Sequence, residues 1–322
     1  MKVVSTWVLV LVGCGGTTDH RIQPGTGEAT DGGVVARCSE TLSFVIDHIM
    51  LPSDRADARL LGCDLDGQGG IDNQLGQELA DFSALGVNVQ RALEQSVATG
   101  KQVLLVDLCA ADLKNVAAAS FRVSVGRYLG PTWDPVVAFS GNGEFARDPT
   151  RGAILDGVIR NRLGQFGPGA VDLPVALVAG AEPLHLTLQS AQVFAVAIAE
   201  GGRRIDGARV CGGLSEPDIS AQVIPAMAQL LVQRIAQGGD LAVQLCATFD
   251  GAHRCAPDAA SCGRFSAGAA GPPTDCIRPS ELETNATASA AIRPDVVVDG
   301  LPLMSFGIGF SAVPAVIRAD VP

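Results

Sequence analysis

The stretch PLHLTLQSAQVFAVAIAEGGRRIDGARVCGG, residues 183–213, decides the fold class. Within it, Leu184, Leu186 and Leu188 alternate with polar residues, which is the period of a β-strand with one buried face. The same pattern fills the chain before it, in ASFRVSVGRYLG, DPVVAFSGNGEFAR and AVDLPVALVAG. We expect His185, on the polar face, to be an ordinary residue of the sheet surface.

Further apolar strands are predicted on both sides of this region. They are TLSFVIDHIMLP (41–52), KQVLLVDLCA (101–110) and LMSFGIGFSAVPAVI (303–317). Strands that are early, central and last, with few helices between them, predict a mainly β (α+β) fold. We expect a β-sandwich-like single domain in which the last strand pairs back into the sheet.

A short helical pair is predicted near the N-terminus of this domain. Apolar residues recur at helical spacing in NQLGQELADFSALG (73–86) and in VNVQRALEQSVATG (87–100). Glycines 86 and 100 end the two segments, and Asn88 is placed to cap the second.

One longer helix is predicted before a Cys-rich loop. Ser215 caps its start, and Gly238-Gly239 stops it. Pro225 falls inside the helical pattern and should kink the helix, because proline has no N–H to donate.

The first residues, MKVVSTWVLVLVGC, indicate export. One Lys precedes an apolar run of about ten residues, which is too short to span a bilayer and fits a signal peptide. The run ends in Leu-Val-Gly-Cys, which resembles the bacterial lipoprotein signal. The resemblance implies cleavage after residue 13, lipidation of Cys14, and, with Gly15 next, an outer membrane lipoprotein on its periplasmic or cell-surface face. The alternatives are an ordinary secretory signal and a buried strand.

Residues 14–36 are rich in Gly, Thr and Asp and are predicted to form a flexible tether, which leaves 37–322 as one β-rich domain. The formal charge of −11 argues against nucleic acid and against docking on anionic lipid. The expected membrane contact is the lipid anchor alone, and the protein or surface partner is not identified. Aromatic residues make up 4% of the chain, which disfavours sugar- and base-binding platforms.

Eight cysteines remain beside Cys14, an even number that indicates disulfides in an exported chain. They are Cys38, Cys63, Cys109, Cys211, Cys246, Cys255, Cys262 and Cys276. The last four lie in the Cys-rich loop 246–276, where we expect pairing within the loop. A zinc site made by His253 with the last three cysteines is the alternative, although their spacing matches no common zinc pattern.

The stretch CDLDGQGGIDNQLG, residues 63–76, resembles a calcium loop of the EF-hand type. Oxygen ligands are expected from Asp64, Asp66, Gln68, the Gly70 carbonyl and Asp72.

The twelfth position of this pattern is Leu75, so the carboxylate that closes an EF-hand loop is missing. Glu78, one helical turn later, is the candidate substitute. The expected Ca²⁺ affinity is weak, on the order of 10⁻⁴ to 10⁻³ M. The alternative is an acidic turn that caps the following helix without a metal. DVVVDGLPLMSFG (295–307) repeats the Asp and Gly frame and is interpreted as a decayed second loop.

The run LPSDRADARLLGCDLDGQGGIDNQLG, the GNGEF turn and the closing SFGIGFSAVPAVI resemble a group of uncharacterised bacterial lipoproteins. These proteins share a DxDGxGxxDNxLG segment after a strand and an apolar FxAVxA-like end. The resemblance spans most of residues 41–317. It implies one long exported domain and no particular chemistry.

The sequence contains no GxSxG elbow, HExxH, P-loop or GxGxxG after a strand, and no Ser/His/Asp set suggests itself. We therefore expect a lipid-anchored cell-envelope protein of structural or adhesive type, stabilised by Ca²⁺ at the loop, rather than an enzyme. The alternative is a secreted hydrolase with two carboxylates in a cleft.

Overall fold

We analysed a computed structural model of the chain, which describes residues 40–318 except 85, 179, 199–203, 238 and 250–276. Residues Ala36–Pro322 form one compact unit. Everything below concerns the described residues of this unit.

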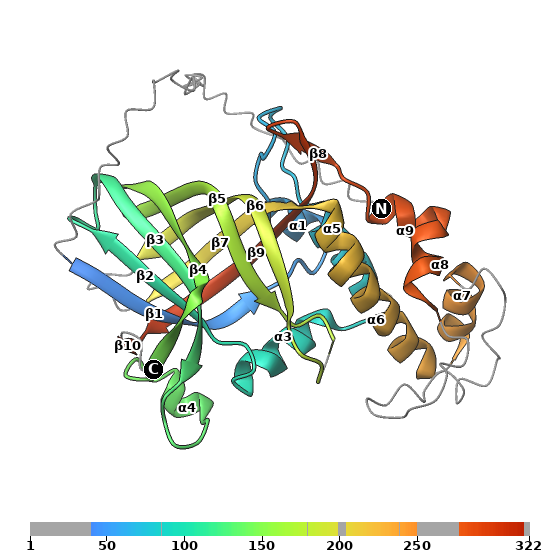
Figure 1. Cartoon of the computed structure of the whole chain (residues 1–322), viewed down its shortest axis with the longest axis horizontal. Helices are drawn as coiled ribbons and strands as arrows, with labels where there is room; N and C mark the ends of the chain where they lie inside the picture. The colour runs from blue at the N-terminus through green and yellow to red at the C-terminus, as the bar shows by residue number, and fades with distance from the viewer. Residues whose placement is uncertain are drawn as a thin grey trace, which may run out of the picture. The chain divides into compact units, whose positions relative to one another are not determined.

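Eight strands form one closed, antiparallel β-barrel (Figure 1). Each strand pairs with its neighbour in the order β1-β2-β3-β4-β5-β6-β7-β9, and β9 pairs back with β1. The barrel strands are β1 (Glu40–Met50), β2 (Leu104–Ala110), β3 (Val116–Tyr128), β4 (Glu144–Arg160), β5 (Leu163–Val175), β6 (Leu184–Ile198), β7 (Ile205–Leu214) and β9 (Leu301–Pro314).

The mainly β class is confirmed, but the β-sandwich is wrong. A sandwich needs two separate sheets, whereas here the pairing of Phe44 with Pro314 and of Met50 with Gly309 closes a single ring. Alternation of buried and exposed residues is the same in both architectures. The closing pair, which distinguishes them, joins segments too far apart in the chain for local patterns to predict.

Two short strands lie outside the ring. β10 (Val316–Arg318) runs parallel to the start of β4, and β8 (Val296–Val298) forms a hairpin with β9. Asp299 and Gly300 in the hairpin turn both have positive φ, the conformation of a type I′ turn with the Asp-Gly sequence it favours. The stretch 295–307, interpreted from the sequence as a decayed second loop, thus forms a β-hairpin and not a loop of the EF-hand type.

Helices occupy the connections between strands. They are α1 (Arg55–Leu61), α2 (Gln74–Ala84), α3 (Val89–Ala98), α4 (Pro135–Ala138), α5 (Glu216–Asp218), α6 (Ile224–Ala236), α7 (Asp240–Phe249), α8 (Pro279–Thr284) and α9 (Ala286–Ala291). The predicted helical pair is present as α2 and α3. The Asn88 side chain caps α3 by accepting a hydrogen bond from the Arg91 amide at 2.8 Å.

The predicted longer helix is built in three parts. Ser215 caps α5, a π-helical turn spans Ile219–Val223, and α6 follows. The π turn sits directly before Pro225, where an α-helical hydrogen bond from residue 225 could not form. Helix α7 runs through Cys246, so the start of the predicted Cys-rich loop is helical.

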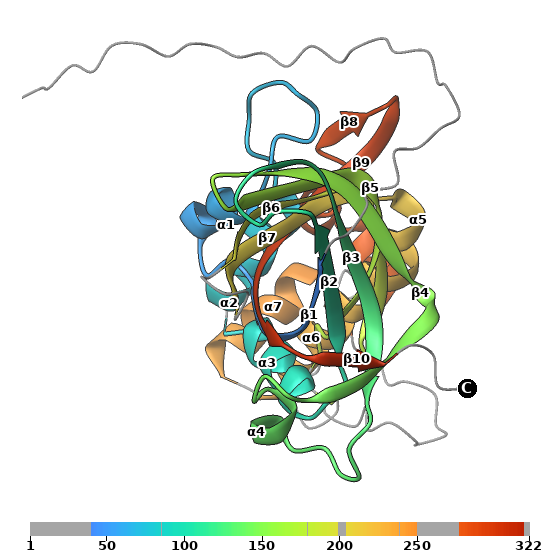
Figure 2. The same ribbon diagram turned by 90° about the vertical axis from the view of Figure 1, so that its left-hand side faces the viewer.

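The barrel interior is filled by side chains. A cavity of only about 20 Å³ lies among residues such as Val106, Val123 and Phe310. Buried residues of α2, α3 and α6 belong to the same hydrophobic core as the inward-facing strand residues. Figure 1 shows α6 at one end of the barrel, and Figure 2, which looks along the barrel, shows α6 behind its opening.

No helix in the described part of the chain is both long and apolar enough to cross a membrane.

Candidate metal-binding loop

The acidic loop begins and ends at one point of the structure. Cys63 and Asp72 form an isolated antiparallel bridge, in which the Asp72 amide donates to the Cys63 carbonyl at 2.9 Å. Gly67 and Gly69 have positive φ, which favours glycine at both positions. In both views the loop projects beside the β8 hairpin (Figures 1 and 2).

The loop gathers three carboxylates. Asp64, Asp66 and Asp72 each offer one oxygen atom, and these atoms lie within 4.8 Å of one another. Such a spacing suits a shared cation with oxygen ligands.

Backbone amides of the loop hold each carboxylate by one oxygen. Asp64 Oδ2 accepts from the Gly69 amide at 3.0 Å, Asp66 Oδ1 from the Gln68 amide at 2.9 Å, and Asp72 Oδ2 from the Leu65 amide at 2.8 Å. The second oxygen of Asp64, Oδ1, is buried and has no hydrogen-bond partner in the described structure. A buried carboxylate oxygen without a partner is costly, and a cation would satisfy it.

The electrostatics of the loop favour a positive ligand. Burial raises the pKa of Asp72 above its usual value, and repulsion from Asp66, Asp295 and Asp64 adds to the rise, against the Leu65 amide, which lowers it. Burial and the neighbouring carboxylates thus disfavour the charged form of Asp72, and a bound cation would offset both effects.

The remaining expected ligands are placed differently. Gln68 and Gly70 are exposed on the loop. Glu78 is not part of the three-carboxylate group; its Oε1 accepts from Gln74 Nε2 at 3.1 Å, and burial raises its pKa. Leu75, at the twelfth position, is 1% exposed and packs in the barrel core. Protein groups alone thus supply an incomplete calcium shell, and water would have to complete it.

Asn73 is a central residue that the sequence reasoning missed. Its side chain is buried and makes four hydrogen bonds. Nδ2 donates to the Ala58 and Gly307 carbonyls, both at 3.0 Å, and Oδ1 accepts from the amides of Gly76 at 3.1 Å and Gly307 at 2.8 Å. Asn73 thereby joins α1, the start of α2 and β9.

Close backbone packing surrounds Asn73. A Cβ atom on Gly76 would lie 2.3 Å from Asn73 Oδ1, and one on Gly307 would lie 2.4 Å from the Leu61 carbonyl oxygen. Glycine is therefore required at both positions. Gly76 ends the DNQLG stretch, and Gly307 lies in the SFGIGF stretch. The glycines that both stretches contain were the sequence signal for this close packing.

Ser305 and Asp295 extend this network. The Ser305 hydroxyl accepts from the Gln74 amide at 2.7 Å and donates to Asp295 Oδ2 at 2.5 Å. The Ser305 amide donates to Asp295 Oδ1 at 2.7 Å. A residue of β9 therefore caps α2, and Asp295 faces the acidic loop closely enough to affect Asp72.

A disulfide anchors the point where the acidic loop begins and ends, which we call the loop neck. Cys63 is bonded to Cys211 of β7, with their Cα atoms 6.2 Å apart. Cys109 is also disulfide-bonded. Cys14, Cys38, the side chain of Cys246, and the expected zinc residues His253, Cys255, Cys262 and Cys276 lie outside the described residues.

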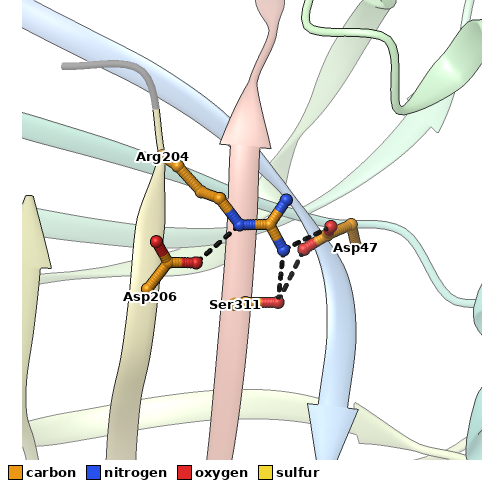
Figure 3. Close-up of polar contacts among 4 residues, drawn as sticks. All are labelled: Asp47, Arg204, Asp206 and Ser311. Atoms are coloured by element: carbon orange, nitrogen blue, oxygen red, sulfur yellow. Dashed lines mark hydrogen bonds and ion pairs between the residues drawn. The ribbon is translucent and has the colours of Figure 1, made fainter. Parts of the chain in front are cut away.

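A second group of polar side chains joins the strands where β9 pairs with β1 and closes the barrel (Figure 3). Arg204, just before β7, donates to Asp47 Oδ2 of β1 at 3.0 Å and to Ser311 Oγ of β9 at 3.2 Å. Ser311 Oγ donates to Asp47 Oδ1 at 2.8 Å, and Asp206 holds the other side of the guanidinium at 2.5 Å. Asp47 lies at the irregularity between Ile46 and His48, where the closing pair shifts register.

The predicted surface residue His185 is exposed, as expected. Its ring lies 3.1 Å from the Arg151 guanidinium, measured from Nε2 to Nη1. Burial lowers its pKa below the usual value, the charge of Arg151 adds to the effect, and Asp172 opposes it.

The chain was compared with family models, curated proteins and solved structures, and none of them matches it.

Proposed function

We propose that this protein is a lipid-anchored cell-envelope protein of structural or interaction type, in which Ca²⁺ fixes the loop 64–72 against the barrel. The observation that supports the metal is the group of three carboxylate oxygens within 4.8 Å, together with the partnerless Asp64 Oδ1. Bound Ca²⁺ would relieve the repulsion among Asp64, Asp66 and Asp72. The loop would then hold the helix α2 and the β8 hairpin through Asn73 and Ser305.

Export is supported by two independent features. Residues 1–14 have the pattern of a lipoprotein signal, and the Cys63–Cys211 disulfide suits an oxidising compartment. The outer membrane is the proposed location, because Gly15 follows the lipidated cysteine.

The hydrolase alternative has less support. It needs two carboxylates facing each other in a cleft. A surface pocket along α6 is lined by no carboxylate among the described residues, its neighbour by Glu182 alone, and a groove outside β1–β4 by Asp107 alone.

The calcium proposal is tested by thermal unfolding in EDTA and in about 10 mM Ca²⁺. With a Kd of about 0.1 mM, this concentration adds about 2.7 kcal/mol to the free energy of unfolding. The expected rise in Tm is a few degrees. The double variant Asp64→Asn/Asp66→Asn should lose the rise, whereas Asp156→Asn, an exposed acid on β4, should keep it.

An equal response of the wild type and the double variant would contradict the metal site. The lipid anchor is tested separately by the substitution Cys14→Ser, which should move the protein from the membrane fraction to the soluble fraction. Unchanged fractionation would contradict the anchor and leave the calcium result unaffected.

A further inference from the structure

A groove of about 380 Å³ runs along the outer face of the barrel, where β1 to β4 lie side by side. Two guanidinium groups, from Arg122 and Arg147, line it together with the hydroxyl residues Thr41, Ser43 and Ser120. The volume falls in the range of small-molecule sites, about 300–1,000 Å³.

The register of the sheet brings these side chains together. Asp107 on β2 is paired with Ser43 on β1 and with Arg122 on β3, and Arg122 is paired with Ile154 on β4. Their chain neighbours, such as Val106 and Phe121, are buried in the core. Because side chains alternate along a strand, this row points away from the core and into the groove.

The charge of Asp107 is neutralised by Arg147 and not by Arg122, its cross-strand neighbour on β3. Arg147 forms an ion pair with Asp107 Oδ2, and its Nε donates to Ser124 Oγ at 3.3 Å. Ser43 Oγ donates to Asp107 Oδ1 at 2.7 Å. The side chains of Arg147 and Asp107 are only 20% and 11% exposed, so this pair is a fixed part of the groove wall.

The charge of the Arg122 side chain is left uncompensated. The guanidinium makes no hydrogen bond and no ion pair with any residue in the described ranges, although the residue is half-buried. Asp156, two positions beyond its partner Ile154 on β4, is exposed to solvent and forms no ion pair with it. A half-buried guanidinium whose five N–H donors have no partner among the described residues is chemically suited to bind an oxyanion.

We propose that this groove binds a small organic anion through Arg122. The guanidinium fork would take the carboxylate or phosphate oxygens in a bidentate pair. The hydroxyls of Thr41 and Ser120 would donate further hydrogen bonds. Ile154, which is 57% exposed, and Ile317 would contact the apolar part of the ligand. A nucleic acid is disfavoured, because the negative charge of the chain repels a polyanion.

The test is isothermal titration of the purified full chain with three probes: benzoate, inorganic phosphate and benzyl alcohol. Benzoate should bind at least about tenfold more tightly than the neutral alcohol. The variant Arg122→Gln should weaken binding by about tenfold or more, and Arg122→Lys should fall between, because it keeps the charge and loses the fork. Arg160→Gln is the matched control and should bind like the wild type, because it removes an exposed arginine of β4 that forms no ion pair within the described part of the chain.

Thermal unfolding of the same variants shows whether each is folded. Arg122→Gln should leave Tm unchanged, because the guanidinium has no partner among the described residues to lose. Tighter binding of phosphate than of benzoate, lost in Arg122→Gln, supports the site and assigns it to phosphorylated ligands. Absence of binding by both oxyanions, or equal binding by the wild type and both Arg122 variants, overturns the proposal.

Discussion

Asn73 and Gly307 are joined by a reciprocal pair of hydrogen bonds, although they are 234 positions apart in the chain. The Asn73 amide group donates to the Gly307 carbonyl at 3.0 Å and accepts from the Gly307 amide at 2.8 Å. One side chain therefore pairs with β9 as a neighbouring strand would. The connection fixes the end of the acidic loop and the start of α2 to the barrel wall.

Replacing Asn73 by Ala should be strongly destabilising. The change leaves the buried amides of Gly76 and Gly307 without their acceptor, and each unsatisfied buried group costs about 1–3 kcal/mol. We expect the free energy of unfolding to fall by about 3–5 kcal/mol in total. Urea denaturation, with the slope compared between variants, measures this change.

Asn88→Ala is the matched control, because it removes an amide that only caps α3 and should cost about 1 kcal/mol. A similar loss in the two variants would show that the Asn73 network contributes no more than a helix cap.

Breaking the ion pair of the outer groove should also be costly. Arg147→Met leaves Asp107 charged and largely buried without its partner, a change that costs about 3–5 kcal/mol in comparable sites. The double variant Asp107→Leu/Arg147→Met removes both charges and should recover most of the loss. Chemical denaturation of the wild type, both single variants and the double variant gives the coupling energy. Additive losses would mean that the two side chains do not stabilise each other.

The disulfide at the loop neck should stabilise both the fold and the proposed metal site. Cys63→Ala/Cys211→Ala opens a link between residues separated by 148 positions and should cost about 2–5 kcal/mol. The neck would then be held mainly by the Cys63–Asp72 bridge, so we expect weaker Ca²⁺ binding as well. Tm and calcium titration of the folded variant measure the two effects separately, and an unchanged Tm would contradict a structural role for the bond.

His185 should make stability depend on pH. Its pKa in the folded state lies below the unfolded value of about 6.5, because burial and Arg151 disfavour the charged ring. The stability it contributes is therefore complete above about pH 6.5 and is lost as the pH falls through the folded pKa. Because the residue is exposed, the effect should be small.

NMR titration of the imidazole gives the folded pKa directly. Arg151→Gln should raise it toward the usual value, whereas Arg160→Gln should leave it unchanged. A folded pKa at or above that of an unstructured peptide would contradict the assignment.

Local patterns predicted the elements that depend on local interactions. The α3 helix has an apolar face at helical spacing and a capping Asn88, and both features act within a few residues. In contrast, α1 is a short helix capped by Asp54 with one buried residue, Ala58. So little apolar surface leaves no periodicity to detect.

The candidate site was predictable only in part. The spacing of Asp64, Asp66 and Asp72 followed a known loop pattern, and the structure brings their oxygen atoms together. The partners of the loop did not follow from the sequence, because Asp295 and Ser305 reach it only when β8 and β9 form their hairpin. Asn73 could not be singled out, because the sequence does not show that a polar side chain is buried with its hydrogen bonds made.

The closing pair of the barrel has a consequence for the order in which the chain folds. Residues 44–50 of β1 pair with residues 309–314 of β9. The first strand of the barrel therefore cannot complete its pairing until the last strand of the barrel has formed. Until then β1 and β7 are open edges with unpaired backbone groups, which readily associate with other chains. Contacts of such long sequence range slow folding. A chain synthesised from its N-terminus therefore keeps two open edges, and the tendency to aggregate, until residues 309–314 have been made and paired with β1.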